Sequence, residues 1–305
     1  MATKNITSPL LAEPSAKKAP ISRRKLTSAL GLIALQIFLT LLLITFLVPA
    51  LWMFSSSLKA STEVFAHPIV WIPETPQWNN FAKVFQLPGI PFGLFIWNTM
   101  KVVFFAVIGT VFSSAMVAYS FSRLRWPGRD FFFAMLIATM MLPEVVMLIP
   151  RFIIFRNLDW IDTLLPLTVP YWFAITPIYV FLMRQFFKSI PMELEEAALI
   201  DGAGRFRILT QIIMPLSKPV IATVVVFATL QHYNDYLNPL IYVNSMQNWT
   251  LPLGIASLNA SESFKATWEM MFAASTVMVV PVIIIFIFAQ RYFVQGITMT
   301  GFGGR

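Results

Sequence analysis

Long apolar stretches alternate with short polar connections along this chain from about residue 29 onward. A helix needs about 20 predominantly apolar residues to cross the hydrocarbon core of a bilayer, which is about 30 Å thick. Six stretches come close to or exceed that length. The pattern therefore predicts an all-α integral membrane protein whose six transmembrane helices cover residues 29–54, 95–121, 131–149, 164–187, 219–243 and 270–288.

The first apolar stretch has 26 residues and no charge. The apolar region of a cleavable signal peptide has only about 7–15 residues, so this stretch is predicted to be retained as a helix. At about 1.5 Å per residue it is roughly 39 Å long and exceeds the hydrocarbon core, so it should tilt or protrude.

Composition supports a membrane class. Apolar residues make up 57% of the 305 residues and charged residues 12%, against about 45–50% and about 25% in soluble domains. We therefore expect a single transmembrane domain over residues 26–295. The chain has no cysteine, which excludes disulfides and thiolate metal sites, and no metal site is predicted.

The distribution of Lys and Arg predicts the orientation, because retained positive charge marks the cytoplasmic side. With both termini inside, 16 basic residues face the cytoplasm and 6 face outward. Residues 1–25 then form a disordered basic cytoplasmic tail near the anionic inner surface of the lipid, and residues 296–305 a cytoplasmic C-terminal tail. The net charge of +8 is dispersed over separate loops, so it indicates no nucleic-acid partner.

The polar stretch at residues 193–215 is unusual because it lies between two strongly apolar segments. Glu193, Glu195 and Glu196 place negative charge near the positive end of a helix dipole. Gly202 can adopt the left-handed conformation that ends a helix. The residues around it are small, so the short helix has few protruding side chains and could fit into the groove of another protein.

The alternative is an amphipathic helix that rests on the inner membrane surface. Anionic lipids would repel its acidic start, and it lacks the Lys-rich polar face of interfacial helices. These two features favour a protein partner.

The same stretch resembles the signature of the transmembrane permease subunits of ATP-binding-cassette importers. That signature is Glu-Ala-Ala, three residues, Gly, nine residues, Ile, one residue and Leu-Pro. It appears here as Glu196, Ala197, Ala198, Gly202, Ile212, Met214 and Pro215. Met214 in place of Leu is the sole departure and conserves volume.

In that family the segment is a cytoplasmic coupling helix between spans four and five, and it docks into a cleft of the ATPase. The resemblance implies a coupling loop at about residues 188–216. It assigns the docking role to Glu196, Ala197, Ala198 and Gly202, with Asp201 as a flanking candidate.

Other segments are similar to one branch of the family, the carbohydrate importers whose second permease is like the smaller maltose-importer subunit. They are SLKASTEVFAHPIVWIPETPQWNNFAKVF, MLPEVVMLIPRF, YNDYLNPLIYVNSMQNWTLPLGI and RYFVQGITMTGFGG. The resemblance implies uptake of an oligosaccharide, a disaccharide or a polyol phosphate through a bacterial-type cytoplasmic (inner) membrane. The implied partners are a second homologous permease in a heterodimer, two copies of a cytoplasmic ATPase and an extracytoplasmic solute-binding protein. The C-terminal tail is expected to reach between the ATPases, or else to be a frayed terminus.

The chain cannot power itself. It has no Gly-Lys pair, so it has no phosphate-cradling P-loop. We expect no cofactor on this chain, with ATP and Mg²⁺ used by the partner ATPase. His67 and His232 are far apart, and neither HExxH nor GxSxG occurs, which disfavours a membrane enzyme. A self-sufficient proton-coupled sugar transporter is the alternative, with Glu144 and Asp235 as its only evident intramembrane carboxylates.

Polar residues in the fifth predicted span suggest a substrate pathway or gate. Ionised groups near the bilayer centre are costly and seldom face lipid. The spacing i, i+3, i+4 and i+7 would place the polar side chains on one helix face, beside Tyr233. They are Gln231, Asn234, Asp235 and Asn238. Two alternatives stay open: the face could hold helices together, or the helix could leave the membrane by Asp235.

The third and fourth spans add further candidates. Glu144 follows Pro143 and could line the pathway, pair with a neighbouring helix or lie at the boundary. The prolines of the fourth span predict kinks that can line a cavity. Tyr171, Trp172 and Tyr179 are interleaved with them, for contact with substrate or for packing.

Overall fold

The computed structural model describes residues 23–260 and 267–301, and it describes side chains within residues 31–258 and 267–288. Regular structure in these ranges is helical, without a strand. The predicted tail at 1–25 falls almost wholly outside the described residues, as do the last four residues of the predicted tail at 296–305. The chain divides into two compact units, Met1–Trp52 and Met53–Arg305, which are described separately.

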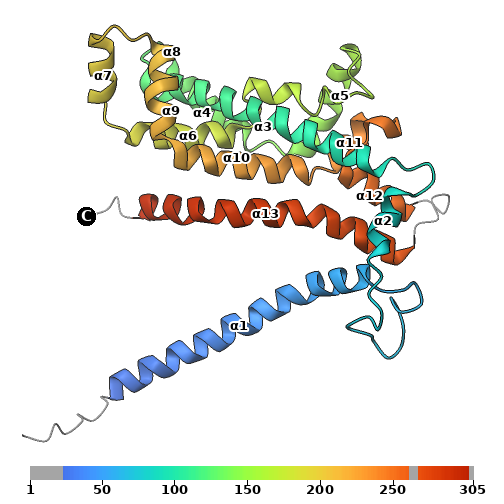
Figure 1. Ribbon diagram of the computed structural model, residues 1–305. Coiled ribbons are helices and arrows are strands. Elements are labelled where there is room, and N and C mark those ends of the chain that lie inside the picture. Colours follow the sequence, from blue (N-terminus) through green and yellow to red (C-terminus); the bar gives the residue numbers. More distant parts are fainter. Residues whose placement is uncertain (1–22, 261–266, 302–305) are drawn as a thin grey trace, which may run out of the picture. The chain divides into compact units, whose positions relative to one another are not determined.

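The first unit consists of most of helix α1 (Arg23–Ser57), which Figure 1 draws in blue. Its described side chains are almost entirely apolar. Thr40 and Thr45 donate their hydroxyl hydrogens to the carbonyls four residues earlier, at 2.8 and 2.9 Å. These internal bonds satisfy the two hydroxyls without water, as a helix in lipid requires.

The second unit contains the remaining elements. They are α2 (Asn79–Phe85), α3 (Phe92–Arg123), α4 (Arg129–Thr139), η1 (Glu144–Met147), α5 (Leu148–Asn157), η2 (Val169–Phe173), α6 (Pro177–Ser189), α7 (Glu193–Ile200), α8 (Arg205–Ile208), η3 (Leu209–Ile213), α9 (Met214–Leu216), α10 (Lys218–Tyr233), α11 (Leu237–Tyr242), η4 (Met246–Asn248), α12 (Leu251–Ala260) and α13 (Trp268–Gly301).

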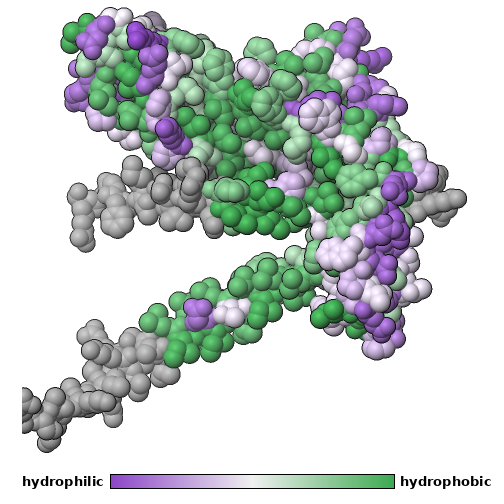
Figure 2. Space-filling view, viewed as in Figure 1, coloured by the Kyte–Doolittle hydropathy of each residue, from purple (hydrophilic) through white to green (hydrophobic). Residues whose placement is uncertain are grey.

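Helix α3 is the centre of this unit. It packs along α6 and α10, and α10 packs against α13. Small buried residues such as Ala118, Val180 and Ala228 let the helices approach closely, which is how membrane helices associate without a hydrophobic driving force. Figure 1 shows α7 and α8 at one end of these helices and α2 and α11 at the other. Figure 2 shows hydrophilic residues gathered at both ends and apolar surface between them.

Among the residues that the structure describes, three helices are long and apolar enough to cross a membrane alone: Gly31–Ser57, Phe92–Arg123 and Trp268–Phe288. They confirm a helix at the first, second and sixth predicted spans. Two bent pairs could bring the number of spans to five.

The prediction of one straight helix over residues 131–149 was wrong. Helix α4 ends at Thr139, and the chain turns by 98° before it continues at Glu144. Pro143 lies in that turn in an extended conformation. A proline disfavours helix at the residue before it and lacks a backbone donor, which explains the break.

The predicted helix over 164–187 is interrupted as well. Helix α6 starts only at Pro177, and Ala174 before it has a positive φ of 53°. Sequence analysis predicted kinks at the prolines, whereas the structure shows a complete break.

The fifth predicted span, 219–243, ends early because α10 stops at Tyr233. Asp235 then accepts the backbone N–H of Asn238 at 3.1 Å and so caps the start of a new short helix, α11. The prediction that the polar residues share one continuous helix face was therefore wrong.

A polar clip joins the loop after α5 to the loop after α11. The carboxylate of Asp162 accepts the backbone N–H groups of Asn244 at 2.9 Å and Ser245 at 2.7 Å, and it accepts the Ser245 hydroxyl. The bond from that hydroxyl is the main reason why the pKa of Asp162 is lowered. The clip holds α11 in place beside α5.

Candidate coupling surface and translocation cavity

The segment that sequence analysis assigned to coupling forms the short helix α7. Its first turn carries Glu193, Glu195 and Glu196, as the dipole argument predicted. The helix ends at Ile200, and Gly202 follows with a φ of 81°. This left-handed conformation is the one that favours glycine, so the predicted helix end is confirmed.

The docking candidates do not all face the same way. Glu196, Ala197, Asp201 and Gly202 are exposed, whereas Ala198 is buried and packs in the main apolar cluster of the unit. The exposed residues therefore form an outer face that is free to meet a partner, and Ala198 belongs to the inner face that holds α7 on the bundle.

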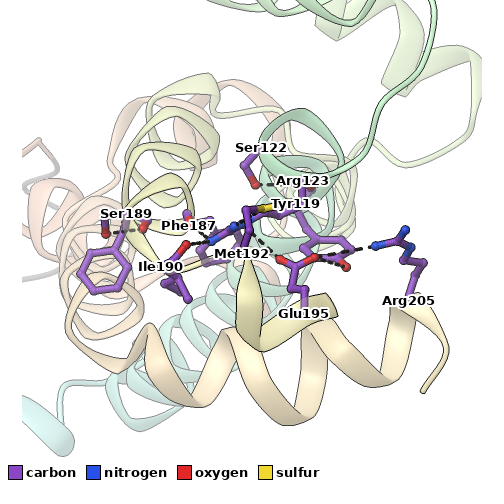
Figure 3. Close-up of polar contacts among 10 residues, drawn as sticks. Tyr119, Ser122, Arg123, Phe187, Ser189, Ile190, Met192, Glu195 and Arg205 are labelled. Atoms are coloured by element: carbon purple, nitrogen blue, oxygen red, sulfur yellow. Dashed lines mark hydrogen bonds and ion pairs between the residues drawn. The ribbon is translucent and has the colours of Figure 1, made fainter. Parts of the chain in front are cut away.

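Glu195 was predicted only as one of three charges near the helix dipole, and the structure gives it a separate, buried position. Its side chain is 1% exposed, and its Oε1 lies 3.1 Å from Nε of Arg123, itself 2% exposed, in a buried ion pair. Arg205 lies 3.8 Å from the other carboxylate oxygen, which also accepts the Tyr119 hydroxyl at 3.3 Å. Figure 3 shows these side chains converging between α3 and α7.

Arg123 also serves the end of α6. Its guanidinium donates to the carbonyls of Phe187 and Ile190. The last carbonyls of a helix have no partner inside the helix, so this contact satisfies them. One arginine at the end of α3 thus joins α6, the linker after it and α7.

A cavity of about 540 Å³ lies where the three broken spans meet. Its wall includes residues from the breaks after α4 and before α6, and residues of α10 and α11 on either side of the break between them. Irregular backbone at membrane depth is tolerated where it is buried or lines a polar cavity. The breaks in the predicted spans therefore have a structural role, since they help to build this cavity.

Four of the predicted pathway residues line the cavity: Glu144, Tyr171, Gln231 and Asn238. Further polar residues in the wall, among them Arg151 and Tyr242, were not predicted. Arg151 lies 3.5 Å from Glu144 in an ion pair, and Tyr242 contributes from α11. Glu144 and Arg151 are seven residues apart, and both lie after the bend, in the continuous helical segment Glu144–Asn157.

The other predicted pathway residues do not line the cavity. Tyr233 is buried and donates to the carbonyl of Met278 in α13 at 2.9 Å, so it ties α10 to α13. Asp235 caps α11, and Asn234 is exposed and bonds back to Leu230.

Tyr179 and Trp172 do not line the cavity, but each contacts a residue of a neighbouring helix. The Tyr179 hydroxyl donates to Oε1 of Gln231 at 2.9 Å and orients that amide. Trp172 packs over Gly109 of α3, where an added Cβ would lie 2.5 Å from the indole.

This close approach gives a first prediction. Gly109→Ala should displace the Trp172 ring and the segment around η2, with a loss of about 1–3 kcal/mol typical of overpacking. The midpoint of thermal unfolding in detergent should fall. Gly93→Ala in the same helix meets no atom within 4 Å and should leave the midpoint unchanged or raise it. Equal midpoints for both variants would contradict the packing argument.

Comparison with known proteins places this arrangement in a family. Residues 109–299 match the family described as the binding-protein-dependent transport system inner membrane component. This range includes the coupling segment and the whole cavity wall.

Three relatives match over most of their length. The arabinooligosaccharides transport system permease protein AraQ of Bacillus subtilis is 31% identical over 89% of this chain and 96% of the relative. The sulfoquinovosyl glycerol permease protein SmoH of Agrobacterium fabrum is 32% identical over 87% and 92%. The sn-glycerol-3-phosphate permease protein UgpE of Yersinia enterocolitica is 33% identical over 77% and 85%.

Solved structures agree with these relatives. A chain of a bacterial ABC transporter for import of the acidic polysaccharide alginate has a TM-score of 0.77 and 26% identity, and the match covers 90% of this chain and all of the other. A chain of the alginate transporter in complex with its pentasaccharide-bound periplasmic protein has a TM-score of 0.63 at 15% identity, which shows the fold. The chain therefore belongs to the family of inner-membrane permease components of binding-protein-dependent transport systems.

Proposed function

We propose that this chain is one of two homologous permease subunits in an ATP-driven importer of a carbohydrate. The observation that carries the proposal is the exposed face of α7, with Glu196 and Ala197 outward and the opposite face anchored to the bundle. Such a helix is suited to receive force from a separate protein. Relatives named as permeases for arabinooligosaccharides and sulfoquinovosyl glycerol support a carbohydrate as the cargo.

The partners follow from this role. Two copies of a cytoplasmic ATPase, which use ATP and Mg²⁺, receive α7 and its counterpart on the second permease. An extracytoplasmic solute-binding protein delivers the sugar, as the pentasaccharide-bound periplasmic protein in complex with the alginate transporter suggests. The chain itself binds no cofactor and changes no bond of the substrate.

The transport cycle needs two states of the permease pair. ATP binding closes the ATPases, α7 moves with them, and the pair turns from inward-open to outward-open so that the binding protein can release its sugar. Hydrolysis resets the pair. The cavity is thereby exposed to each side of the membrane in turn.

The topology that fits this cycle has six spans with both termini in the cytoplasm. The spans are α1, α3, the bent pair α4 and α5, η2 with α6, α10, and α13. The placement of Arg123 and Arg205 at the α7 end of the unit supports a cytoplasmic position for that end.

The cavity is proposed as this chain's part of the sugar pathway. Gln231 and Asn238 offer amide donors and acceptors, and Tyr171 offers an aromatic face. These are the groups that orient a hydroxyl-rich ligand in a mostly apolar pocket.

A substitution in the cavity tests this part of the proposal. Gln231→Met keeps the length of the side chain and removes the amide, so KM for uptake should rise by about 3- to 10-fold, the effect of a neutral hydrogen bond. The maximal rate should change little, because the lost contact is one of binding. Tyr179→Phe removes the same internal bond from behind the wall and should raise KM less. If both substitutions raised KM equally, the role of Gln231 would be packing and not contact with the sugar.

A mild-detergent purification of the tagged chain from its native membrane, followed by mass spectrometry, tests the assembly. We expect a second permease and an ATPase to be recovered with it. Recovery of the folded, monodisperse chain alone would contradict the proposal and favour a self-sufficient transporter.

A further inference from the structure

The buried ion pair between Arg123 and Glu195 lies between the outer face of α7 and the membrane helices. Glu195 and Glu196 are neighbours on the same short helix, about 100° apart around its axis, and the first is buried whereas the second is exposed. One carboxylate is presented to a partner, and the other is held by α3. Any force applied to the outer face must reach the bundle through the inner face.

The inner face has two kinds of contact. Ala198 packs in the apolar cluster, which resists compression but can slide. Glu195 and Arg123 form an ion pair at 3.1 Å between two buried side chains, and hydrogen bonds to the carbonyls of Phe187 and Ile190 hold the Arg123 guanidinium in turn. This arrangement, visible in Figure 3, connects α7 to α3 and to the end of α6 through one guanidinium.

The link continues to the cavity along α6. This helix ends at Ser189, next to the carbonyls that Arg123 holds, and it begins at Pro177, which lines the cavity. At about 1.5 Å per residue, its 13 residues span roughly 20 Å as a rigid rod. Movement of its end at Arg123 is therefore transmitted to the cavity wall.

We propose that Arg123 and Glu195 are positioning residues that make α7 move as one body with α3 and α6, and so transmit ATPase closure to the cavity. This inference rests on the proposed function, because it needs an ATPase at α7. The pair therefore does more than stabilise the fold: it determines how much sugar is transported for each ATP that is hydrolysed.

The test uses the complete importer, reconstituted in proteoliposomes with its partner permease, ATPase pair and sugar-loaded binding protein. The key variant is the double substitution Arg123→Met with Glu195→Met. Apolar residues of similar volume can replace a buried ion pair without loss of folding. Arg123→Met also removes the donor from the carbonyls of Phe187 and Ile190, so the midpoint of thermal unfolding of the variant is measured together with its transport. The double substitution Arg125→Met with Asp130→Met changes two exposed charges just after α3, outside the coupling loop, and serves as the matched control.

We expect the key variant to keep its ATPase through purification and to hydrolyse ATP. Sugar imported per ATP hydrolysed should fall by about tenfold or more. The control should keep the ratio of the wild type. An unchanged ratio in the key variant would overturn the inference, and so would loss of the ATPase from that complex, since the pair would then serve docking itself. Failure of the wild-type chain to bind any ATPase would instead refute the proposed function.

Discussion

Gly202→Asp is expected to abolish most ATP-dependent uptake while the protein stays in the membrane at its normal level. Gly202 has a φ of 81°, and no atom lies within 4 Å of the place where a Cβ would be. The substitution therefore causes no clash. It adds backbone strain and a negative charge next to the outer face of α7. A residue at the centre of a docking surface contributes about 2 kcal/mol or more, which is roughly 30-fold in affinity.

Two controls separate the charge from the strain. Gly204→Asp places the same carboxylate two residues away, where the backbone is extended with a φ of −71°. Gly202→Asn keeps the position without the charge, and Asn tolerates the left-handed conformation. Both should retain more uptake than Gly202→Asp. If Gly202→Asp took up sugar at the wild-type rate, Gly202 would not be part of the docking surface.

Glu195→Ala is expected to be the most destabilising single substitution in the coupling loop. It leaves the Arg123 guanidinium buried without its carboxylate, and breaking a buried pair in this way costs about 3–5 kcal/mol. The midpoint of thermal unfolding in detergent should fall markedly.

The neighbouring substitution Glu196→Ala is the matched control. Glu196 is exposed, so its loss should change stability by less than about 0.5 kcal/mol. Its effect should appear as reduced coupling in the assembled importer. A stable Glu195→Ala variant, or an equally unstable Glu196→Ala variant, would contradict the assignment of inner and outer faces.

Local signals in the sequence were sufficient for some of these features. The uncharged stretch of α1 and the apolar lengths of α3 and α13 predicted helices that the structure confirms. Gly202 predicted the end of α7, because a residue without a side chain is the usual choice for a positive φ. These signals depend only on neighbouring residues, which a sequence displays directly.

Other features depend on contacts between distant residues. Three glutamates stand at the start of α7, and only the packing of α3 decides that Glu195 is the one that turns inward. Its partner Arg123 belongs to a helix much earlier in the chain, so no local pattern joins the two residues.

The fifth predicted span failed for a different reason. Apolar residues continue past Tyr233, but Asp235 competes with the helix by capping the next one. The third predicted span rested on its hydrophobic length, although Pro143 within it was a local sign of the break.

We propose that this chain moves sugar only with energy from a separate ATPase. Uptake of radiolabelled sugar can be measured in proteoliposomes that contain the chain, its partner permease and the ATPase, with the loaded binding protein outside and ATP inside. We expect uptake that stops when either the ATPase or ATP is left out. Uptake by the chain alone, driven by a proton gradient without ATP, would contradict it.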